Sequence, residues 1–233
     1  MSSDTFTGFP RGISTFLTDL AANNNKPWFE AHRRDYEQNL LEPTRAFADT
    51  MADRLTEIAP PGLGEVQGST FRIYRDVRFS KDKTPYKTHL DIAFNAAGSP
   101  KGESPGYYFH LDPPRIMLGA GMHAFPKAFL TAYREAVVED QLGSLLRRAI
   151  DDAAAAGQEI WGESYKRVPT GYDANHPRAD LLRYGGLFVA VTLVISSLPF
   201  FVGLAVVLPV LAHSTWHLYR KVVEPDPRPR QDR

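Results

Sequence analysis

The sequence contains no cysteine, which excludes disulfide bonds, thiolate catalysis and zinc sites built from cysteine. Neither sign of charge is in excess, because 27 lysines and arginines balance 27 aspartates and glutamates. The chain as a whole therefore presents no basic field for nucleic acid. No P-loop, Gly-x-Ser-x-Gly or Gly-x-Gly-x-x-Gly motif occurs, and the first residues lack the basic and apolar regions of a secretory signal. These absences remove several classes of protein but identify no reaction and no cofactor.

Several stretches of the sequence have the apolar spacing of amphipathic helices. Apolar residues recur at helical spacing over residues 13–20 and again over 43–58, and Pro27 is placed to open a short helix between them. Two more amphipathic stretches follow later in the chain, at about 127–140 and 142–156. These patterns predict helices on both sides of a central stretch that has a different period.

In that central stretch the apolar residues recur with a period of two. Residues 71–79 and 88–94 alternate on either side of a polar turn that contains proline, which predicts two antiparallel strands with one buried face. Residues 107–111 and 116–122 supply two further strands. On the first strand, the predicted buried face consists of Phe71, Ile73, Val77 and Phe79. We therefore predict an α+β fold, in which an antiparallel sheet of about four strands carries packed helices.

The densest polar feature is a set of cationic side chains within 18 residues of the predicted hairpin. The set consists of Arg72, Arg75, Arg78, Lys81, Lys83, Lys87 and His89. Convergent guanidinium and ammonium groups suit a phosphate or carboxylate ligand. Asp76, Asp82 and Asp91 are interleaved with them and could neutralise part of the charge. Three interpretations stay open: a solvated face with ion pairs, an anion-binding site and a catalytic site.

His89 and Asp91 are the candidate catalytic residues, because they share one strand face as a base and an orienting carboxylate would. Residues two apart on a strand are, however, too distant for a dependable hydrogen bond. Adding His110 and Asp112 from the next strand gives a His/Asp set that could hold a hard metal ion. No recognised ligand spacing supports such a site, so no metal is assigned from the sequence.

The run from Phe71 to His89, FRIYRDVRFSKDKTPYKTH, resembles the signature of a bacterial and fungal family, domain of unknown function (DUF) family 2461. Other segments fit the family in order: Asn23 to Phe29, Gly106 to Tyr108, Gly119 to Gly121, and Val168 to Tyr184. The resemblance covers residues from about 6 to 184. It implies no activity, cofactor or catalytic residue that can be carried over.

The C-terminal part has a different character. Leu187 to Ala212 contains no Asp, Glu, Lys, Arg or His, and Trp216, Tyr219 and a basic pair follow it. A run of this length with aromatic and basic flanks predicts one transmembrane helix. Residues 208–221 also resemble the last segment of bacterial integral membrane proteins, DUF family 2189.

These patterns predict three regions. Residues 1–184 form a soluble α+β domain without its usual C-terminal helices, residues 185–221 a membrane segment, and residues 222–233 a disordered tail. The predicted partner is a lipid bilayer, through Leu187 to Ala212, whereas nucleic acid is not an expected partner. The predicted localisation is the membrane, with the N-terminal domain on the cytoplasmic side.

Three functional hypotheses follow. The first is a membrane-tethered domain that binds an anionic ligand, bearing phosphate or carboxylate, through the basic hairpin. The second is a hydrolase for a phosphorylated or acidic substrate, with His89 as the base and arginines that stabilise the oxyanion. The third is a fusion product without a function of its own.

Overall fold

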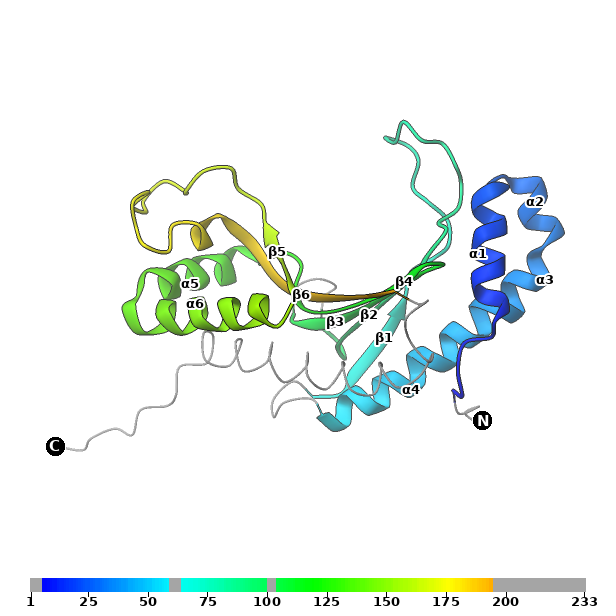
Figure 1. Cartoon of the computed structure of the whole chain (residues 1–233), viewed down its shortest axis with the longest axis horizontal. Coiled ribbons are helices and arrows are strands. Elements are labelled where there is room, and N and C mark those ends of the chain that lie inside the picture. The colour runs from blue at the N-terminus through cyan, green and yellow to red at the C-terminus, as the bar shows by residue number, and fades with distance from the viewer. Residues whose placement is uncertain (1–5, 59–63, 100–103, 195–233) are drawn as a thin grey trace. The chain divides into compact units, whose positions relative to one another are not determined.

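The structure, a computed structural model, describes residues 6–58, 64–99 and 104–194 (Figure 1). Its α-helices are α1 (Gly12–Ala22), α2 (Lys26–Ala31), α3 (Arg33–Tyr36), α4 (Glu42–Ile58), α5 (Lys127–Val138) and α6 (Asp140–Ala155). A π-helical turn, η1 (Glu37–Leu41), joins α3 to α4, and a 3-10 turn, η2 (Leu181–Arg183), precedes the last strand. The strands are β1 (Val66–Thr70), β2 (Leu90–Ala96), β3 (Gly106–Asp112), β4 (Arg115–Met122), β5 (Glu159–Glu163) and β6 (Tyr184–Val194).

The described residues form two compact units. The first comprises residues 6–58, 64–99, 106–118 and 192–194, and the second comprises residues 104–105 and 119–191. The strand order of the sheet is β1-β2-β3-β4-β6-β5. The β1–β2, β2–β3 and β5–β6 pairs are antiparallel, so the predicted α+β class with an antiparallel sheet is confirmed.

The core of the first unit lies between its helices and one face of the sheet. The predicted apolar face of α1 is buried, as is Phe47 on α4. Helix α4 packs along β1 (Figure 1), and its Phe47 ring lies 4.7 Å from Phe109 on β3 and 6.4 Å from Phe94 on β2, centroid to centroid. Burial of these large rings supplies much of the free energy that holds the helices to the sheet.

The second unit has a separate apolar cluster, which α5 and α6 form together with the segment that leads into β6. Its fully buried members include Val137, Leu146, Leu181 and Leu182. The Tyr133 hydroxyl donates a hydrogen bond of 3.1 Å to the Leu181 carbonyl oxygen. The two amphipathic helices predicted at about 127–140 and 142–156 are thus confirmed as α5 and α6.

The predicted hairpin is displaced along the chain. Residues 71–89 form a long loop between β1 and β2, with a single isolated bridge between Tyr74 and Tyr86. Because most of this loop is not strand, the predicted alternation of burial fails. Ile73 is buried, but Phe71 is exposed and Phe79 is 97% exposed. The strands predicted at 107–111 and 116–122 are confirmed as β3 and β4, and the sheet has six strands where four were predicted.

The predicted transmembrane helix is wrong for the residues that the structure describes. Residues 184–194 form strand β6, which lies between β4 and β5. Leu187, Val189 and Ala190 are buried there, so their apolar character reflects a central strand covered on both faces. No helix within residues 6–58, 64–99 and 104–194 combines the length and apolar composition that a membrane crossing requires.

The glycines that precede the apolar run have a packing role in the second unit. A Cβ on Gly186 would lie 2.2 Å from the His123 carbonyl oxygen, and the Phe125 amide donates to the Gly185 carbonyl oxygen at 2.6 Å. The backbone of β6 therefore passes its neighbour too closely for any side chain at Gly186. This close approach explains why position 186 is a glycine.

The rest of the predicted membrane segment, residues 195–221, and the predicted tail, 222–233, lie outside the described residues. Strand β6 begins at Tyr184 and continues to Val194, across the predicted boundary at 184. The bilayer contact and the membrane localisation that were predicted from this region stay predictions.

Candidate functional site

The polar cluster of the first unit is built by the pairing of β2 with β3. Asp91 on β2 stands directly opposite His110 on β3. Side chains alternate along a strand, so Tyr108 and Asp112 share the sheet face of His110, while Ile92 and its partner Phe109 turn to the opposite face and the core. The sequence pattern of these two strands thus places polar groups on one face and apolar groups on the other.

Asp91 is the centre of this cluster, and its side chain is only 8% exposed. Its two carboxylate oxygens each face two donor groups. The Tyr108 hydroxyl donates to Oδ1 at 2.6 Å, and His110 Nδ1 lies 2.8 Å from the same oxygen. Lys87 Nζ lies 3.3 Å and His89 Nε2 3.1 Å from Oδ2. A buried carboxylate with this number of partners is held firmly in one orientation.

These hydrogen bonds decide the charge state of the cluster. Burial raises the pKa of the Asp91 carboxyl, but hydrogen bonds from His110, His89 and Tyr108 outweigh it and hold that pKa well below its ordinary value. The hydrogen bond to Asp91 raises the pKa of His110, although burial opposes it. Asp91 is therefore a carboxylate at neutral pH, with one imidazole ring directed at it from β3, that of His110, and one from the bend before β2, that of His89.

Asp112 and Arg115 complete the cluster on the other side of His110. His110 Nε2 lies 3.4 Å from Asp112 Oδ2. Arg115, at the start of β4, donates from Nε to the same oxygen at 2.7 Å and from its backbone amide to Asp112 Oδ1 at 3.1 Å. The His110 ring is thus held between two carboxylates, and its Nδ1 edge is fixed toward Asp91.

Three side chains in this cluster lie close enough together to hold a metal ion between them. One nitrogen of His89, one nitrogen of His110 and one carboxylate oxygen of Asp91 all lie within 4.8 Å of one another. Two imidazoles and one carboxylate suit a first-row divalent transition metal and leave further coordination positions for water or substrate. The Asp112 contact to the second nitrogen of His110 has the form that orients metal-binding histidines in known sites.

The structure corrects the expectation that His89 cannot reach Asp91. His89 lies in a bend just before β2 begins at Leu90. Because the backbone is not extended at this point, the ring folds back and places Nε2 at 3.1 Å from the carboxylate. The two candidate catalytic residues are therefore in contact, with 34% of the His89 side chain exposed.

The predicted cationic residues do not converge on one point. Arg78 forms a two-bond pair with Asp76, at 2.9 and 2.6 Å, and Arg75 pairs with Asp82 at 2.5 Å. Together with the Lys87–Asp91 pair, these contacts match the first of the three interpretations, a solvated face on which interleaved aspartates neutralise arginines and lysines.

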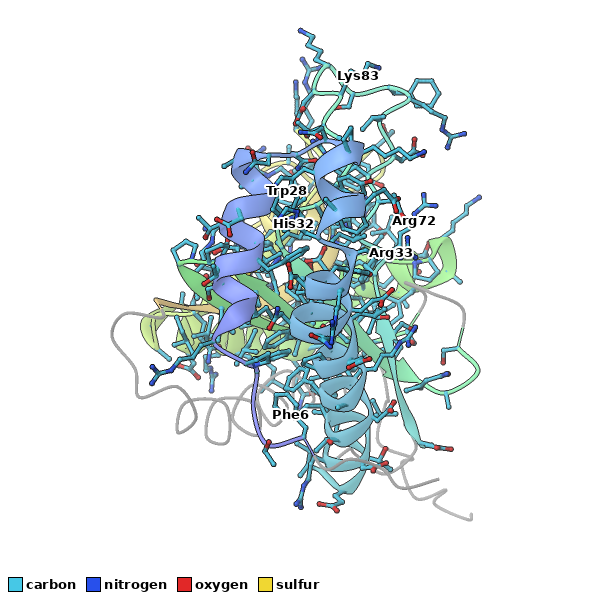
Figure 2. The ribbon with its side chains drawn as sticks, turned by 90° about the vertical axis from the view of Figure 1, so that its right-hand side faces the viewer. Phe6, Trp28, His32, Arg33, Arg72 and Lys83 are labelled. Atoms are coloured by element: carbon cyan, nitrogen blue, oxygen red, sulfur yellow. The ribbon has the colours of Figure 1, made fainter. Side chains whose placement is uncertain are left out.

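The remaining cations are spread along the loop. Lys83 Nζ donates to the Val77 carbonyl oxygen at 2.9 Å. Figure 2 shows Lys83 at the outer end of the loop and Arg72 well below it, nearer the sheet. Among the described residues, Arg72 and Lys81 are exposed and form no ion pair. Of the predicted ligand-binding set, only Lys87 and His89 belong to the cluster around Asp91.

Sequence reasoning missed Tyr108 and His110 as hydrogen-bond partners of the buried Asp91 carboxylate, and Asp112 as the second partner of the His110 ring. The signal that identifies them is alternation: Tyr108, His110 and Asp112 are the polar positions of a strand whose other positions are apolar. Placing these side chains in one cluster with Asp91 requires the register between β2 and β3, which is not evident from the sequence alone.

Comparison with curated proteins gives no match. The family model described as conserved hypothetical protein (DUF2461) matches residues 12–198, a range that contains the whole cluster around Asp91 and all of β6. The match supports the first resemblance found in the sequence and extends past Tyr184; it gives no support to the second resemblance, at residues 208–221. The chain therefore belongs to the DUF2461 family.

Proposed function

We propose that this protein binds a divalent transition-metal ion through His89, Asp91 and His110. The single observation that supports the proposal most directly is that the three ligand atoms, from β2, β3 and the bend before β2, lie within 4.8 Å of one another. Nitrogen ligands favour zinc and iron over calcium and magnesium, which prefer all-oxygen sites. The sites of metal-activated hydrolytic enzymes combine three such protein ligands with a bound water.

The surroundings of the three residues support the proposal in two ways. Tyr108 and Lys87 hold the Asp91 carboxylate, so this ligand is positioned before an ion arrives. His89 is about one third exposed, whereas the Asp91 and His110 side chains are 8% and 16% exposed. An ion would therefore enter past His89 and keep its open positions on the solvent side.

The test is direct titration of the metal-free full chain with Zn²⁺ and with Fe²⁺ under anaerobic conditions, followed by calorimetry. We expect one ion per chain and a loss of about tenfold to a hundredfold in affinity when Asp112→Asn removes the support of His110. His110→Ala should abolish the site. The matched control is His123→Ala, an exposed histidine of the second unit, which should leave stoichiometry and affinity unchanged.

Equal binding by the wild type and His110→Ala would refute the proposal, because the ion would then be held elsewhere. Absence of binding to a folded wild type would refute it as well. Circular dichroism of each variant shows whether a loss of binding reflects a loss of fold.

A second candidate, hydrolysis without a metal, is supported by the contact between His89 Nε2 and Asp91, in which the carboxylate orients a partly exposed imidazole. In that case His89 acts as the base for water, and Lys87 is the nearest cation for an acidic substrate. The two candidates differ in one measurement: turnover by the base survives exhaustive treatment with a chelator, whereas metal-dependent turnover is lost and returns on addition of the ion.

A further inference from the structure

The most exposed large apolar side chain of the described residues lies at the outer part of the 71–89 loop. Phe79 is 97% exposed, and no residue of the proposed metal site requires it there. An isolated exposed leucine or valine is ordinary on a protein surface, but a phenylalanine held fully in water loses the full free energy of its burial. The Arg78 guanidinium carbon lies 5.9 Å from the centre of the Phe79 ring, and the rest of the ring is available to a partner.

Hydrogen bonds and ring stacking hold the base of this loop, which carries Phe79, against the first unit. The Arg75 amide donates to the Pro85 carbonyl oxygen at 2.9 Å, and the Lys87 amide donates to the Ile73 carbonyl oxygen at 2.7 Å. The Asn24 side chain forms two further hydrogen bonds with the backbone of Tyr86, at 2.9 and 3.0 Å. The Tyr86 ring is buried and stacks on the Phe29 ring of helix α2, with 4.1 Å between the ring centres.

The charge of the loop sets it apart from the rest of the protein. Between residues 72 and 87 there are six lysines and arginines and two aspartates, 6 − 2 = +4, while the whole chain has a formal charge of zero. The remaining residues therefore sum to −4. Lys81 is exposed without an ion-pair partner among the described residues, and Lys83 lies at the outer end of the loop (Figure 2).

We propose that the outer part of this loop, residues 77–83, docks on an anionic lipid surface, with Phe79 inserted among the headgroups and Lys81 and Lys83 beside the lipid phosphates. An apolar ring at the tip with cations around it matches the layered chemistry of a bilayer interface. A single-stranded nucleic acid would instead need a series of aromatic rings for successive bases, and the tip offers one ring. The site is separate from the cluster around Asp91 and does not depend on a metal ion.

The absence of cysteine makes a site-specific test available. In the full chain, Ser80→Cys places a single thiol beside Phe79, and an environment-sensitive fluorophore on it reports entry into the interface. Vesicles of phosphatidylcholine alone are compared with vesicles that contain phosphatidylserine. The control is Ile58→Cys with the same fluorophore, because Ile58 is an exposed apolar residue at the end of α4. A label is needed because sedimentation alone would not separate this loop from the apolar residues 195–212.

We expect the emission of the Ser80 label to rise and shift to the blue with anionic vesicles, and the Ile58 label to stay unchanged. Lys81→Gln should lower the apparent partition coefficient about fivefold, and Phe79→Ser about tenfold. Raising the salt to 1 M, where the Debye length is about 3 Å, should weaken binding further.

Each of the following outcomes overturns the proposal. The Ser80 label does not respond to anionic vesicles, or it responds equally to neutral ones, or the Ile58 label responds as strongly. Unchanged partitioning of Phe79→Ser would show that the ring does not insert. Binding of the labelled loop to a protein or an oligonucleotide, with no response to vesicles, would assign it to a different class of partner.

Discussion

Replacing Asp91 with asparagine perturbs the centre of the cluster with little change in side-chain volume. The wild-type carboxylate accepts contacts from Tyr108 and His110 on one oxygen and from Lys87 and His89 on the other. An asparagine has one oxygen and one NH₂ group, so either pair of donors must face another donor. Because Tyr108 and His110 are the more buried pair, we expect the amide oxygen to turn toward them.

The magnitude follows from the two contacts that are lost. A hydrogen bond to a charged group contributes about 1.5–3 kcal/mol to stability, and Lys87 and His89 are exposed enough to regain part of this from water, so we expect a loss of about 3 kcal/mol. The sign of the pH dependence is also fixed. The pKa of Asp91 is lowered on folding, so its contribution is present above the ordinary carboxyl pKa of about 3.9 and is lost at lower pH.

His110 sets the upper limit of the pH range in which the cluster around Asp91 stabilises the fold. Its pKa is raised on folding, so its contribution is complete below the ordinary value of about 6.5 and is lost as the pH rises through the raised value. The difference between wild type and Asp91→Asn should therefore be largest between about pH 4 and about pH 6.5.

The assay is urea denaturation of both proteins in the presence of a chelator, at several pH values across this range. Asp76→Asn serves as the matched control, because Asp76 pairs with Arg78 in a fully solvated position and should leave the free energy of unfolding unchanged. A loss below about 1 kcal/mol at pH 6, or a loss that is undiminished at pH 3, would refute the reasoning about Asp91.

Two further predictions concern the loop and the last strand. Backbone and side-chain hydrogen bonds lower the pKa of Asp82 to about 2; Arg75→Gln removes one of them and should raise the midpoint measured by carboxyl-carbon NMR, so an unchanged midpoint would contradict the Arg75–Asp82 pair. Val189 in β6 is 4% exposed, and Val189→Ala should lower the free energy of unfolding by about 2 kcal/mol; no change would contradict the place of β6 in the sheet.

Helices and inner strands could be predicted wherever the apolar period follows directly from one buried face. The stretches 13–20 and 43–58 became α1 and α4, and the stretch 107–111 became β3. Residues 71–79 also alternate, yet they form a loop, because only Ile73 of the predicted face is buried. A period of two over nine residues can thus occur in a loop, where here Arg75 and Arg78 form ion pairs with Asp82 and Asp76.

The prediction of a transmembrane helix failed in the described residues 187–194 for a different reason. A continuous apolar run fits both a membrane helix and a strand that is covered on both faces, and the period does not separate the two. The glycine at position 186 is the feature of the sequence that favours the strand. Gly186 lies too close to the His123 carbonyl for a side chain, which is typical of a backbone packed inside a sheet and not of a membrane helix entry.

The cluster around Asp91 could be predicted only in part, since composition places histidine and aspartate on two strands but not the register between them. Once that register is known, the hydrogen bonds around Asp91 acquire a meaning beyond stability. His89 and His110 already aim one nitrogen each at the Asp91 carboxylate, so an ion would replace protons between groups that are already in position. Little rearrangement would then accompany the binding of an ion, and the ordering of these side chains would be completed on folding and not on binding. We therefore expect nearly superimposable metal-free and metal-loaded forms of the strand pair β2–β3. A site assembled by the ion itself would instead show His89 displaced from Asp91 before loading.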